Sequence, residues 1–376
     1  MESLKNWIIM VIKKFITQVL IVITRFLMFF ISRVDKKGNL VLPLLFNGYE
    51  RYSDNFCNFK LYPKNADYFI PSNIKTVTKP GEFAIVLQGI IEIRDNFTIE
   101  TVKLYKKIFP GAIIIISTWD YTDKDLLEEF KGLGCEIVLS KDFKPCGFGN
   151  VNYQICTSLA GIKRAKELGA LYTLKNRSDL RIYKEFAFEY LKSLLTIFPV
   201  DKDNPFKLKG RIISPAGNSG QMFMPLWLQD FYYFGYTGDL INFFDIPYDS
   251  RQVHSAQKYL KEKYGKFDGE IMCDIPVPEI YITKTFIEKY MKAEMKVINH
   301  WNLIRQYFIM VDHEALNSYW PKYKLYNLSS FYCEYDGKHN FIDPYKHISS
   351  ADFLNLYNNQ YEYEDWMEGI RKKNIY

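Results

Sequence analysis

Tyr172-Thr-Leu-Lys-Asn-Arg-Ser-Asp-Leu-Arg181 begins with the alternation of a short β-strand and ends in a cluster of charges. In open α/β sheets, ligands bind at the carboxyl ends of strands. Arg177, Asp179 and Arg181 are each two positions apart, so on an extended chain we expect them on one face. There Asp179 could hold a divalent cation, and the arginines could grip a diphosphate. The alternative is a surface salt-bridge cluster at a strand end.

The residues before this stretch alternate between strand and helix. Each expected strand is a short apolar run, as in central parallel strands covered on both faces. The predicted strands are residues 83–91, 112–119, 135–139 and the stretch from 172, and the predicted helices between them cover 96–109, 123–132 and 155–168. Four β-α units in succession predict a doubly wound α/β sheet.

Polar residues at the strand exits and before the third helix are the candidates for binding a nucleotide. The Gln88-Gly89 step would let the backbone approach a ligand closely, and the amides of residues 150–154 could contact a sugar or base, or could instead cap the helix. The candidate binding residues are Gln88, Gly89, Thr118, Asn150, Asn152, Gln154, Lys175, Arg177 and Arg181. The glycine motifs of dinucleotide oxidoreductases and P-loop enzymes and the nucleophile elbow of hydrolases are absent, so these classes are disfavoured.

An α/β sheet with a charged fourth-strand exit is the layout of A-type glycosyltransferases, and the resemblance to one family is closer than layout. Five short motifs occur in order across residues 83–323: Leu87-Gln-Gly89, Ser117-Thr-Trp119, Asn150-Val-Asn-Tyr-Gln154, Leu174 to Arg181, and Trp320-Pro-Lys-Tyr323. Together they resemble the WavE lipopolysaccharide synthesis family. The resemblance implies a glycosyltransferase-like fold and a role in assembling lipopolysaccharide or another surface glycan.

The resemblance also implies substrates and a location. We expect a nucleotide-sugar donor, a lipid-linked glycan acceptor, transfer of a hexosyl type, and a position on the cytoplasmic face of the bacterial inner membrane. Two alternatives stay open: a catalytically inert scaffold for glycan assembly, and a nucleotidyl- or phosphotransferase that grips its donor with the same arginines.

The sequence departs from the A-type pattern at the metal-binding motif. Asp-x-Asp is replaced by Arg177-Ser178-Asp179, which leaves one carboxylate. Asp179 could still bind Mg²⁺ or Mn²⁺ together with the diphosphate and water. Alternatively, Lys175, Arg177 and Arg181 could neutralise the leaving group without metal.

An inverting transfer needs a base to deprotonate the acceptor hydroxyl. Our first candidate is Glu279, which follows Pro278 in the first turn of a predicted helix, and the second is Asp230. Asp230 belongs to the Tyr- and Phe-rich segment 227–247, which is either core with capping acids or a wall on which sugars stack. Residues 211–215 are expected to form another strand, and the turn at 216–221 is expected to border the site.

The positive charge of the chain lies almost entirely at its amino terminus. Residues 1–40 hold seven Lys or Arg against Glu2 and Asp35, a local charge of +5 out of +6 in the 376-residue chain. The nearly neutral remainder argues against a nucleic-acid-binding protein. Six scattered cysteines without a C-x-x-C pair indicate a reducing compartment.

Residues 4–33 are apolar but are interrupted by Lys13, Lys14 and Arg25, so the longest uncharged run is too short to span a bilayer. Their helical pattern predicts an amphipathic interfacial helix that meets anionic headgroups, with packing on the body or a tilted span as alternatives. We therefore expect four segments: a membrane-associating helix at 1–38, an irregular linker at 39–80, a glycosyltransferase-like α/β domain at 81–325, and a helical carboxyl-terminal extension at 326–376.

Overall fold

The computed structural model describes residues 2–35, 40–53, 60–72, 78–216, 222, 225–252, 258, 262, 277–294, 296–321 and 348–361. The chain forms two units, Met1–Tyr62 and Pro63–Tyr376. Residues 217–221 of the predicted turn, Lys322 and Tyr323 of the last family motif, and most of the predicted carboxyl-terminal extension lie outside the described residues.

The first unit contains two helices, α1 (Glu2–Val34) and α2 (Val41–Tyr52). Asp35 ends the first helix and starts the second, because its Oδ2 accepts hydrogen bonds from the backbone N–H groups of Leu40 at 3.1 Å and Val41 at 2.7 Å. The expectation of an irregular linker from residue 39 is therefore wrong at α2. Pro43 does not interrupt this helix because it lies in the first turn, where the missing N–H has no intrahelical partner to lose.

Helix α1 confirms the helix expected at residues 4–33. Its part from Met10 to Val34 has a mean hydropathy of 2.0 over its most apolar window, and that window is exposed. At 1.5 Å per residue, 25 residues extend for about 37 Å, which exceeds the roughly 30 Å of a bilayer core. By length and composition this helix could cross a membrane as well as lie on one, since a single Arg25 can extend toward the headgroups.

The second unit is built on a seven-stranded mixed sheet. The strands are β1 (Phe83–Gln88), β2 (Ile113–Trp119), β3 (Glu136–Ser140), β4 (Tyr172–Arg177), β6 (Ile212–Ala216), β7 (Tyr232–Tyr236) and β8 (Phe308–Asp312). They lie in the order β3-β2-β1-β4-β7-β6-β8, with β7 antiparallel to both of its neighbours and the other pairs parallel. This arrangement confirms the predicted α/β class and its doubly wound parallel half.

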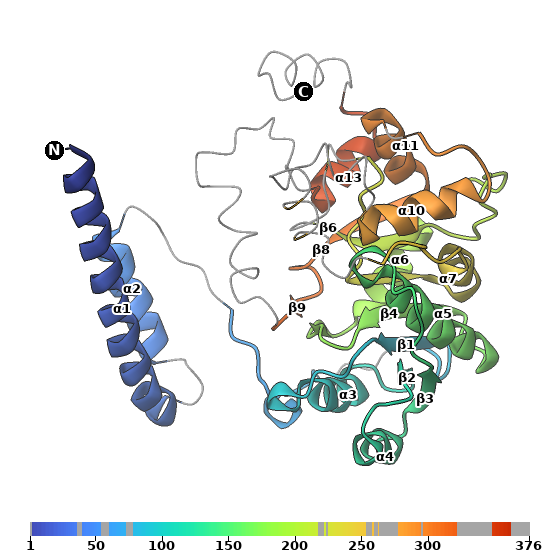
Figure 1. The fold of residues 1–376 in the computed structure, drawn as a ribbon. Helices are drawn as coiled ribbons and strands as arrows, with labels where there is room; N and C mark the ends of the chain where they lie inside the picture. Colours follow the sequence, from blue (N-terminus) through green and yellow to red (C-terminus); the bar gives the residue numbers. More distant parts are fainter. Residues whose placement is uncertain are drawn as a thin grey trace. The chain divides into compact units, whose positions relative to one another are not determined.

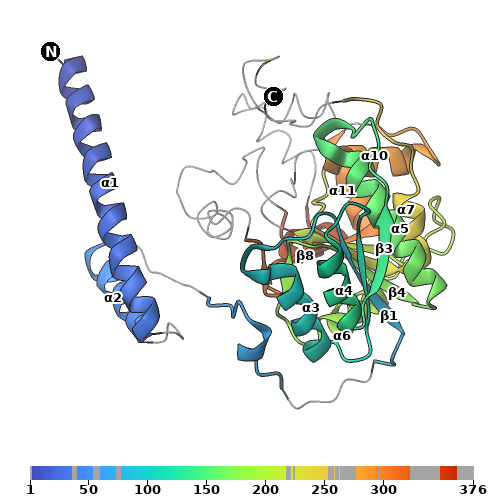
Figure 2. The same ribbon diagram turned by 60° about the horizontal axis from the view of Figure 1, so that its bottom comes forward.

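The crossover helices cover both faces of the sheet (Figures 1 and 2). Helices α3 (Phe97–Ile108) and α4 (Lys124–Gly132) lie on one face, and α5 (Val151–Glu167) covers β1 and β2 on the other. Gly161 lets α5 approach the sheet closely, because a Cβ at this position would lie 2.9 Å from the Cβ of Ser117. The strand ends are therefore held at fixed spacing by a tight helix-sheet contact.

The half of the unit after β4 was predicted less completely. The segment 227–247 forms β7 and helix α7 (Thr237–Phe244), and its aromatic side chains are mostly buried, so it is core rather than an exposed wall. The helix at Pro278 is confirmed as α10 (Pro278–Glu288). The remaining elements are α6 (Ala187–Ile197), α11 (Val297–Tyr307), α13 (Ser350–Tyr357) and a small sheet of β5 (Arg181–Ile182) and β9 (Ser318–Tyr319).

Candidate active site

Three strands deliver polar residues to one edge of the sheet. The chain leaves β1 toward β2 and later returns to β4 on the other side of β1, so the carboxyl ends of β1 and β4 flank the switch point where such sheets bind ligands. Gln88 and Arg177 end these strands opposite each other. Because β7 runs antiparallel, the residues that precede it, including Asp230, lie at the same edge.

Arg177 is held rigidly at this edge. Its Nε and Nη2 donate to Oδ1 and Oδ2 of Asp179 at 2.7 and 2.9 Å, and its guanidinium carbon lies 5.6 Å from the ring centre of Phe231 and 5.4 Å from that of Trp320. Burial alone would lower the pKa of Arg177, but the hydrogen bonds and charge of Asp179, with the charges of Asp230 and Glu279, raise it above its usual value. Arg177 is therefore a permanently charged group of fixed orientation.

The donor set around Asp179 does not fit the predicted metal site. Both carboxylate oxygens of Asp179 accept hydrogen bonds from Arg177. Within the described ranges, no group of three His, Cys, Asp or Glu side chains has the geometry to hold a metal ion. Asp179 instead orients the arginine, as in a bidentate fork of the kind that fixes guanidinium groups.

Arg181 does not join Arg177, contrary to the expectation that both arginines grip one ligand. The Arg181 side chain is fully buried on the face of α3, where its Nε donates to Thr101 at 2.8 Å and its Nη2 donates to the carbonyl of Phe97 at 2.7 Å. Its Nη1 donates to the carbonyl of Lys64 at 2.8 Å. Ser178 and Asp179 leave the extended path after β4, so the spacing of two residues no longer keeps side chains on one face.

Lys175 is also buried rather than open to a ligand. Its Nζ donates to the backbone carbonyl of Asp230 at 2.7 Å and lies 5.5 Å from the ring centre of Tyr233 and 5.7 Å from that of Phe244. Burial, and to a lesser extent the charge of Arg177, lowers the pKa of Lys175 to about 7, although Asp230 and Asp179 act in the opposite direction. Lys175 therefore supports Asp230 and does not grip phosphate directly.

The two candidate bases, Glu279 and Asp230, act electrostatically on each other and on Arg177. Enclosure of the Glu279 carboxyl, followed by the charge of Asp230, raises the pKa of Glu279 to about 8, and Arg177 acts in the opposite direction. Glu279 enters from the first turn of α10, whereas Asp230 enters from the start of β7. A carboxylate can hold an acceptor hydroxyl group and accept its proton, and these two residues are the candidates for that role.

The amide candidates have different roles. Gln154 Nε2 donates to the carbonyl of Asp230 at 3.4 Å, so this carbonyl binds both Lys175 and Gln154. Asn152 is fully buried and ties α5 to the backbone of Asp249, through bonds of 2.7 Å in both directions. Asn150 is the first flanking residue of α5 and makes no side-chain capping bond.

The candidates at the ends of β1 and β2 lie at the same edge but interact with protein groups. Gln88 Oε1 accepts from Thr157 of α5 at 2.8 Å, and the hydroxyls of Thr118 and Thr122 lie 3.1 Å apart. Gly89 has a φ of +102°, a conformation that side-chain-bearing residues rarely adopt. The backbone at the end of β1 can therefore approach a ligand, as the Gln-Gly step suggested.

Some residues of this edge were not predicted as site residues. Phe231 and Trp320 flank Arg177, and only the family motif pointed to the tryptophan. His313 hydrogen-bonds through Nε2 to Gln229 at 2.9 Å and through Nδ1 to Ser318 at 2.6 Å, and burial lowers its pKa to about 4. A neutral His313 thus fixes the residue before Asp230, a role with no local sequence signal.

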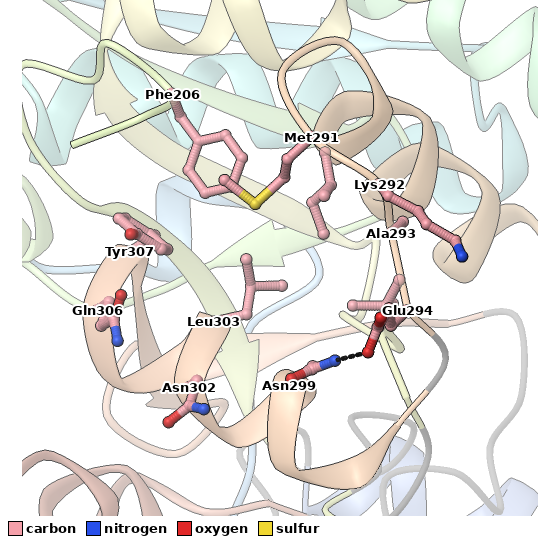
Figure 3. A pocket seen from close by; sticks show the side chains of 12 residues that line it. Phe206, Met291, Lys292, Ala293, Glu294, Asn299, Asn302, Leu303, Gln306 and Tyr307 are labelled. Carbon is pink, nitrogen blue, oxygen red and sulfur yellow. Dashed lines mark hydrogen bonds between the residues drawn. The ribbon is translucent and has the colours of Figure 1, made fainter.

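A separate pocket of about 330 Å³ lies between the end of α10 and α11 (Figure 3). Its lining includes Phe206 and Leu303, and both of its asparagines are engaged, since Asn299 donates to Glu294 at 3.3 Å and Asn302 accepts from Arg305 at 2.8 Å. None of the charged residues at the sheet edge lines this pocket. The chemistry therefore favours the sheet edge as the candidate active site.

The second unit is a mixed α/β domain with a cluster of ionisable residues at the switch point of its sheet. A family model described as WavE lipopolysaccharide synthesis matches residues 83–370, most of the chain. The chain belongs to the WavE lipopolysaccharide synthesis family. A comparison with curated proteins finds no match.

Several solved structures resemble the chain loosely. A mannose-1-phosphate geranyltransferase from Thermus thermophilus is 11% identical over 57% of this chain and 72% of its own, with a TM-score of 0.30. A cytidylyltransferase from Leptospira borgpetersenii is 12% identical over 60% and 94%, with a TM-score of 0.29. A glycosyltransferase involved in glycosylation of the major capsid of PBCV-1 is 11% identical over 61% and 81%, with a TM-score of 0.26. These scores are too low to carry an argument about activity.

Proposed function

We propose that the protein is a nucleotide-sugar-dependent glycosyltransferase, of hexosyltransferase type, that adds a sugar to a lipid-linked glycan. The observation that carries this proposal is the guanidinium of Arg177, which Asp179 and two aromatic rings hold at the switch point of the sheet. The charges of the candidate bases Glu279 and Asp230 act on this group. Membership of a lipopolysaccharide synthesis family supports a glycan as the product.

Arg177 is the proposed anchor of the donor diphosphate. A guanidinium has five N–H donors, and two of them bind Asp179. The other three have no protein acceptor among the residues with described positions and could bind phosphate oxygens. Since Asp179 and two aromatic rings hold the group in place, it would stabilise the leaving diphosphate without reorganising.

Glu279 is the proposed base. The hydroxyl of the acceptor attacks the anomeric carbon, the bond from that carbon to the diphosphate breaks, and the hydroxyl proton passes to Glu279. A carboxyl whose pKa is about 8 is a stronger base than an ordinary glutamate once it is ionised. Asp230, placed by Lys175 and Gln154, would keep the attacking hydroxyl oriented.

We also propose a location and a division of the chain. Residues 1–38 would attach the enzyme to anionic lipids on the cytoplasmic face of the bacterial inner membrane, and residues 81–325 would carry catalysis. The exposed apolar surface of α1 supports attachment. A membrane-bound enzyme would meet a lipid-linked acceptor by diffusion in two dimensions.

A panel of UDP-, GDP-, CMP- and dTDP-sugars tests this proposal by thermal shift, with and without Mn²⁺, because a bound donor raises the unfolding temperature. The expected result is a shift with one nucleotide class, and release of the nucleoside diphosphate when acceptor lipids are added. Release of the sugar 1-phosphate instead would indicate transfer of the nucleotidyl group. If no donor stabilises the protein, the scaffold becomes the better account.

A further inference from the structure

Tyr233 is a buried tyrosine whose hydroxyl has no hydrogen-bond partner in the described part of the chain. Its ring is packed against Phe243 and Phe244 of α7, with ring centres 5.1 and 5.6 Å apart, and it lies opposite Lys175 in the β4–β7 pair. The side chain therefore has little freedom to find another partner. A buried hydroxyl without a partner is unfavourable, so it calls for an explanation.

The ring of Tyr233 lies beside the candidate site, because its centre is 5.5 Å from Nζ of Lys175, which donates to the carbonyl of Asp230 at 2.7 Å. Burial, and then the charges of Asp230 and Glu279, raise the pKa of Tyr233 well above its ordinary value. The hydroxyl therefore stays protonated at any physiological pH and can donate a hydrogen bond. Glu279 belongs to the first turn of α10 and Asp230 precedes β7 by two residues, so the charges that act on Tyr233 come from two parts of the chain.

Tyr232, the neighbouring residue in β7, is a buried tyrosine whose hydroxyl does have a hydrogen-bond partner. Its side chain is equally buried, on the opposite face of the sheet, and its hydroxyl donates to the carbonyl of Val311 at 3.0 Å. Among the described residues, the same strand thus holds one tyrosine hydroxyl with a protein partner and one without.

We propose that the Tyr233 hydroxyl binds the acceptor substrate, by donating a hydrogen bond to the oxygen of the attacking hydroxyl group. This inference rests on the proposed glycosyl transfer and adds a residue to it. The attacking oxygen then accepts from Tyr233 and donates to Glu279, which fixes its direction toward the anomeric carbon. The proton transferred in the reaction is the one that goes to Glu279, and Tyr233 keeps its own.

Tyr233→Phe and Tyr232→Phe in the full-length protein form a matched pair that tests the inference. Tyr233→Phe removes a hydroxyl that has no partner among the described residues, so its unfolding temperature should equal or exceed that of the wild type. Its kcat/KM for acceptor should fall about tenfold to a hundredfold, the range for loss of one hydrogen bond to a reacting group. Tyr232→Phe should do the reverse, with a lower unfolding temperature and near-normal kcat/KM.

The donor provides the control that separates this inference from the proposed function. The thermal shift caused by the donor should be the same in Tyr233→Phe and wild type, because Tyr233 is assigned to the acceptor side. A wild-type enzyme that transfers sugar while Tyr233→Phe keeps its full kcat/KM would overturn the inference alone. So would a Tyr233→Phe protein destabilised as much as Tyr232→Phe, since the hydroxyl would then have a protein partner. Absence of transfer by the wild type would overturn both.

Discussion

Arg177 and Asp179 face each other through two hydrogen bonds of 2.7 and 2.9 Å, so an arginine and a carboxylate two residues apart form a closed fork at the end of β4. The sequence resemblance matches this stretch, Arg177-Ser178-Asp179, to the Asp-x-Asp pair of A-type enzymes. The carboxylate of Asp179 orients the guanidinium of Arg177 and is not arranged to bind a metal ion. The predictions below follow from that difference and from the carboxyl pair beside it.

Arg177→Lys should reduce turnover strongly while leaving the fold intact. The lysine keeps the charge but loses the planar fork that Asp179 and the two rings orient. Loss of an oriented donor to a leaving group costs about 10²- to 10³-fold in kcat. Steady-state kinetics with the donor identified by thermal shift would measure this effect.

Arg181→Lys is the matched variant, with the opposite expectation. Arg181 is buried, and its three nitrogens bind Thr101 and backbone carbonyls, which a lysine cannot replace. We expect the free energy of unfolding to fall by about 2–4 kcal/mol, with near-normal kcat in the fraction that remains folded. Loss of turnover in a fully stable Arg181→Lys protein would show that this arginine does reach the substrate.

Asp179→Asn should weaken donor binding by the same factor in EDTA and in Mn²⁺. The amide still has one acceptor oxygen but no longer closes the fork, so Arg177 is less well oriented. Isothermal titration with the donor in both buffers would measure the two factors. If the variant loses only the Mn²⁺-dependent part of binding, Asp179 is a metal ligand after all.

Glu279→Gln should change how stability depends on pH. The pKa of Glu279 is about 8 in the folded protein against 4.5 for the ordinary group, so the folded state holds a proton that the unfolded state releases. The free energy of unfolding of the wild type should therefore fall as pH rises from about 4.5 to about 8. Glutamine removes this contribution, so chemical denaturation across that range should show a flatter profile. An unchanged slope would mean that the Glu279 carboxyl ionises normally.

Lys175→Met should also change how stability depends on pH, but at higher pH and in the opposite direction to Glu279→Gln. The folded protein releases the Lys175 proton near pH 7, whereas the unfolded chain keeps it to about 10.5, so this group makes stability increase with pH between those values. Methionine fills a similar volume and removes that increase. The variant should also lose activity at every pH, because the carbonyl of Asp230 loses its 2.7 Å bond. A variant that keeps the wild-type slope would contradict a buried, weakly basic Lys175.

The amino-terminal helix should bind membranes partly through charge. Changing Lys13, Lys14 and Arg25 to Gln should weaken binding to anionic vesicles but not to neutral ones, since each basic residue near an anionic surface contributes about 1 kcal/mol. High salt alone should release little protein because the apolar surface of α1 is unaffected by screening. Vesicle sedimentation measures both effects.

A chain that begins at Pro63 is the control for the membrane arm. It removes both helices of the first unit but keeps the backbone of residues 63 and 64, which Arg181 binds. This shortened protein should stay in the supernatant, and its sedimentation with vesicles would place the membrane contact elsewhere. Resistance of the full-length protein to alkaline carbonate would show that α1 spans the bilayer.

The parallel half of the sheet could be predicted because its signals are local. Continuous apolar runs such as Ala84–Leu87 indicate buried strands, and Asp123 stands where a helix begins, as its hydrogen bond to the backbone of Leu126 confirms. The strand β7 was not predicted, because Tyr232–Tyr236 lies in a longer aromatic segment with no alternation of polar and apolar residues. A strand buried on both faces cannot be distinguished from other core segments by periodicity.

The site was predicted in its residue types but less well in its contacts. Glu279 and Asp230 were selected separately, and nothing in the sequence shows that their charges act on each other. Arg181 was assigned to the ligand because two-residue spacing keeps side chains on one face only while the backbone stays extended. The turn at Ser178 breaks this condition, and turns are set by tertiary contacts such as the bond from the Thr98 hydroxyl to the carbonyl of Ser178.

The pairing of β4 with β7 fixes the distance between Arg177 and Asp230. Arg177 follows Asn176, and Asp230 precedes Tyr232 by two residues, while Asn176 and Tyr232 face each other across the two strands. A slip of one residue in this pairing would displace Asp230 from Arg177 by about 3.4 Å and turn Tyr233 to the other face of the sheet. The distance between the charged residues is thus set by the backbone hydrogen bonds between the two strands. A change in this pairing would abolish the activity of the site without changing any residue in it.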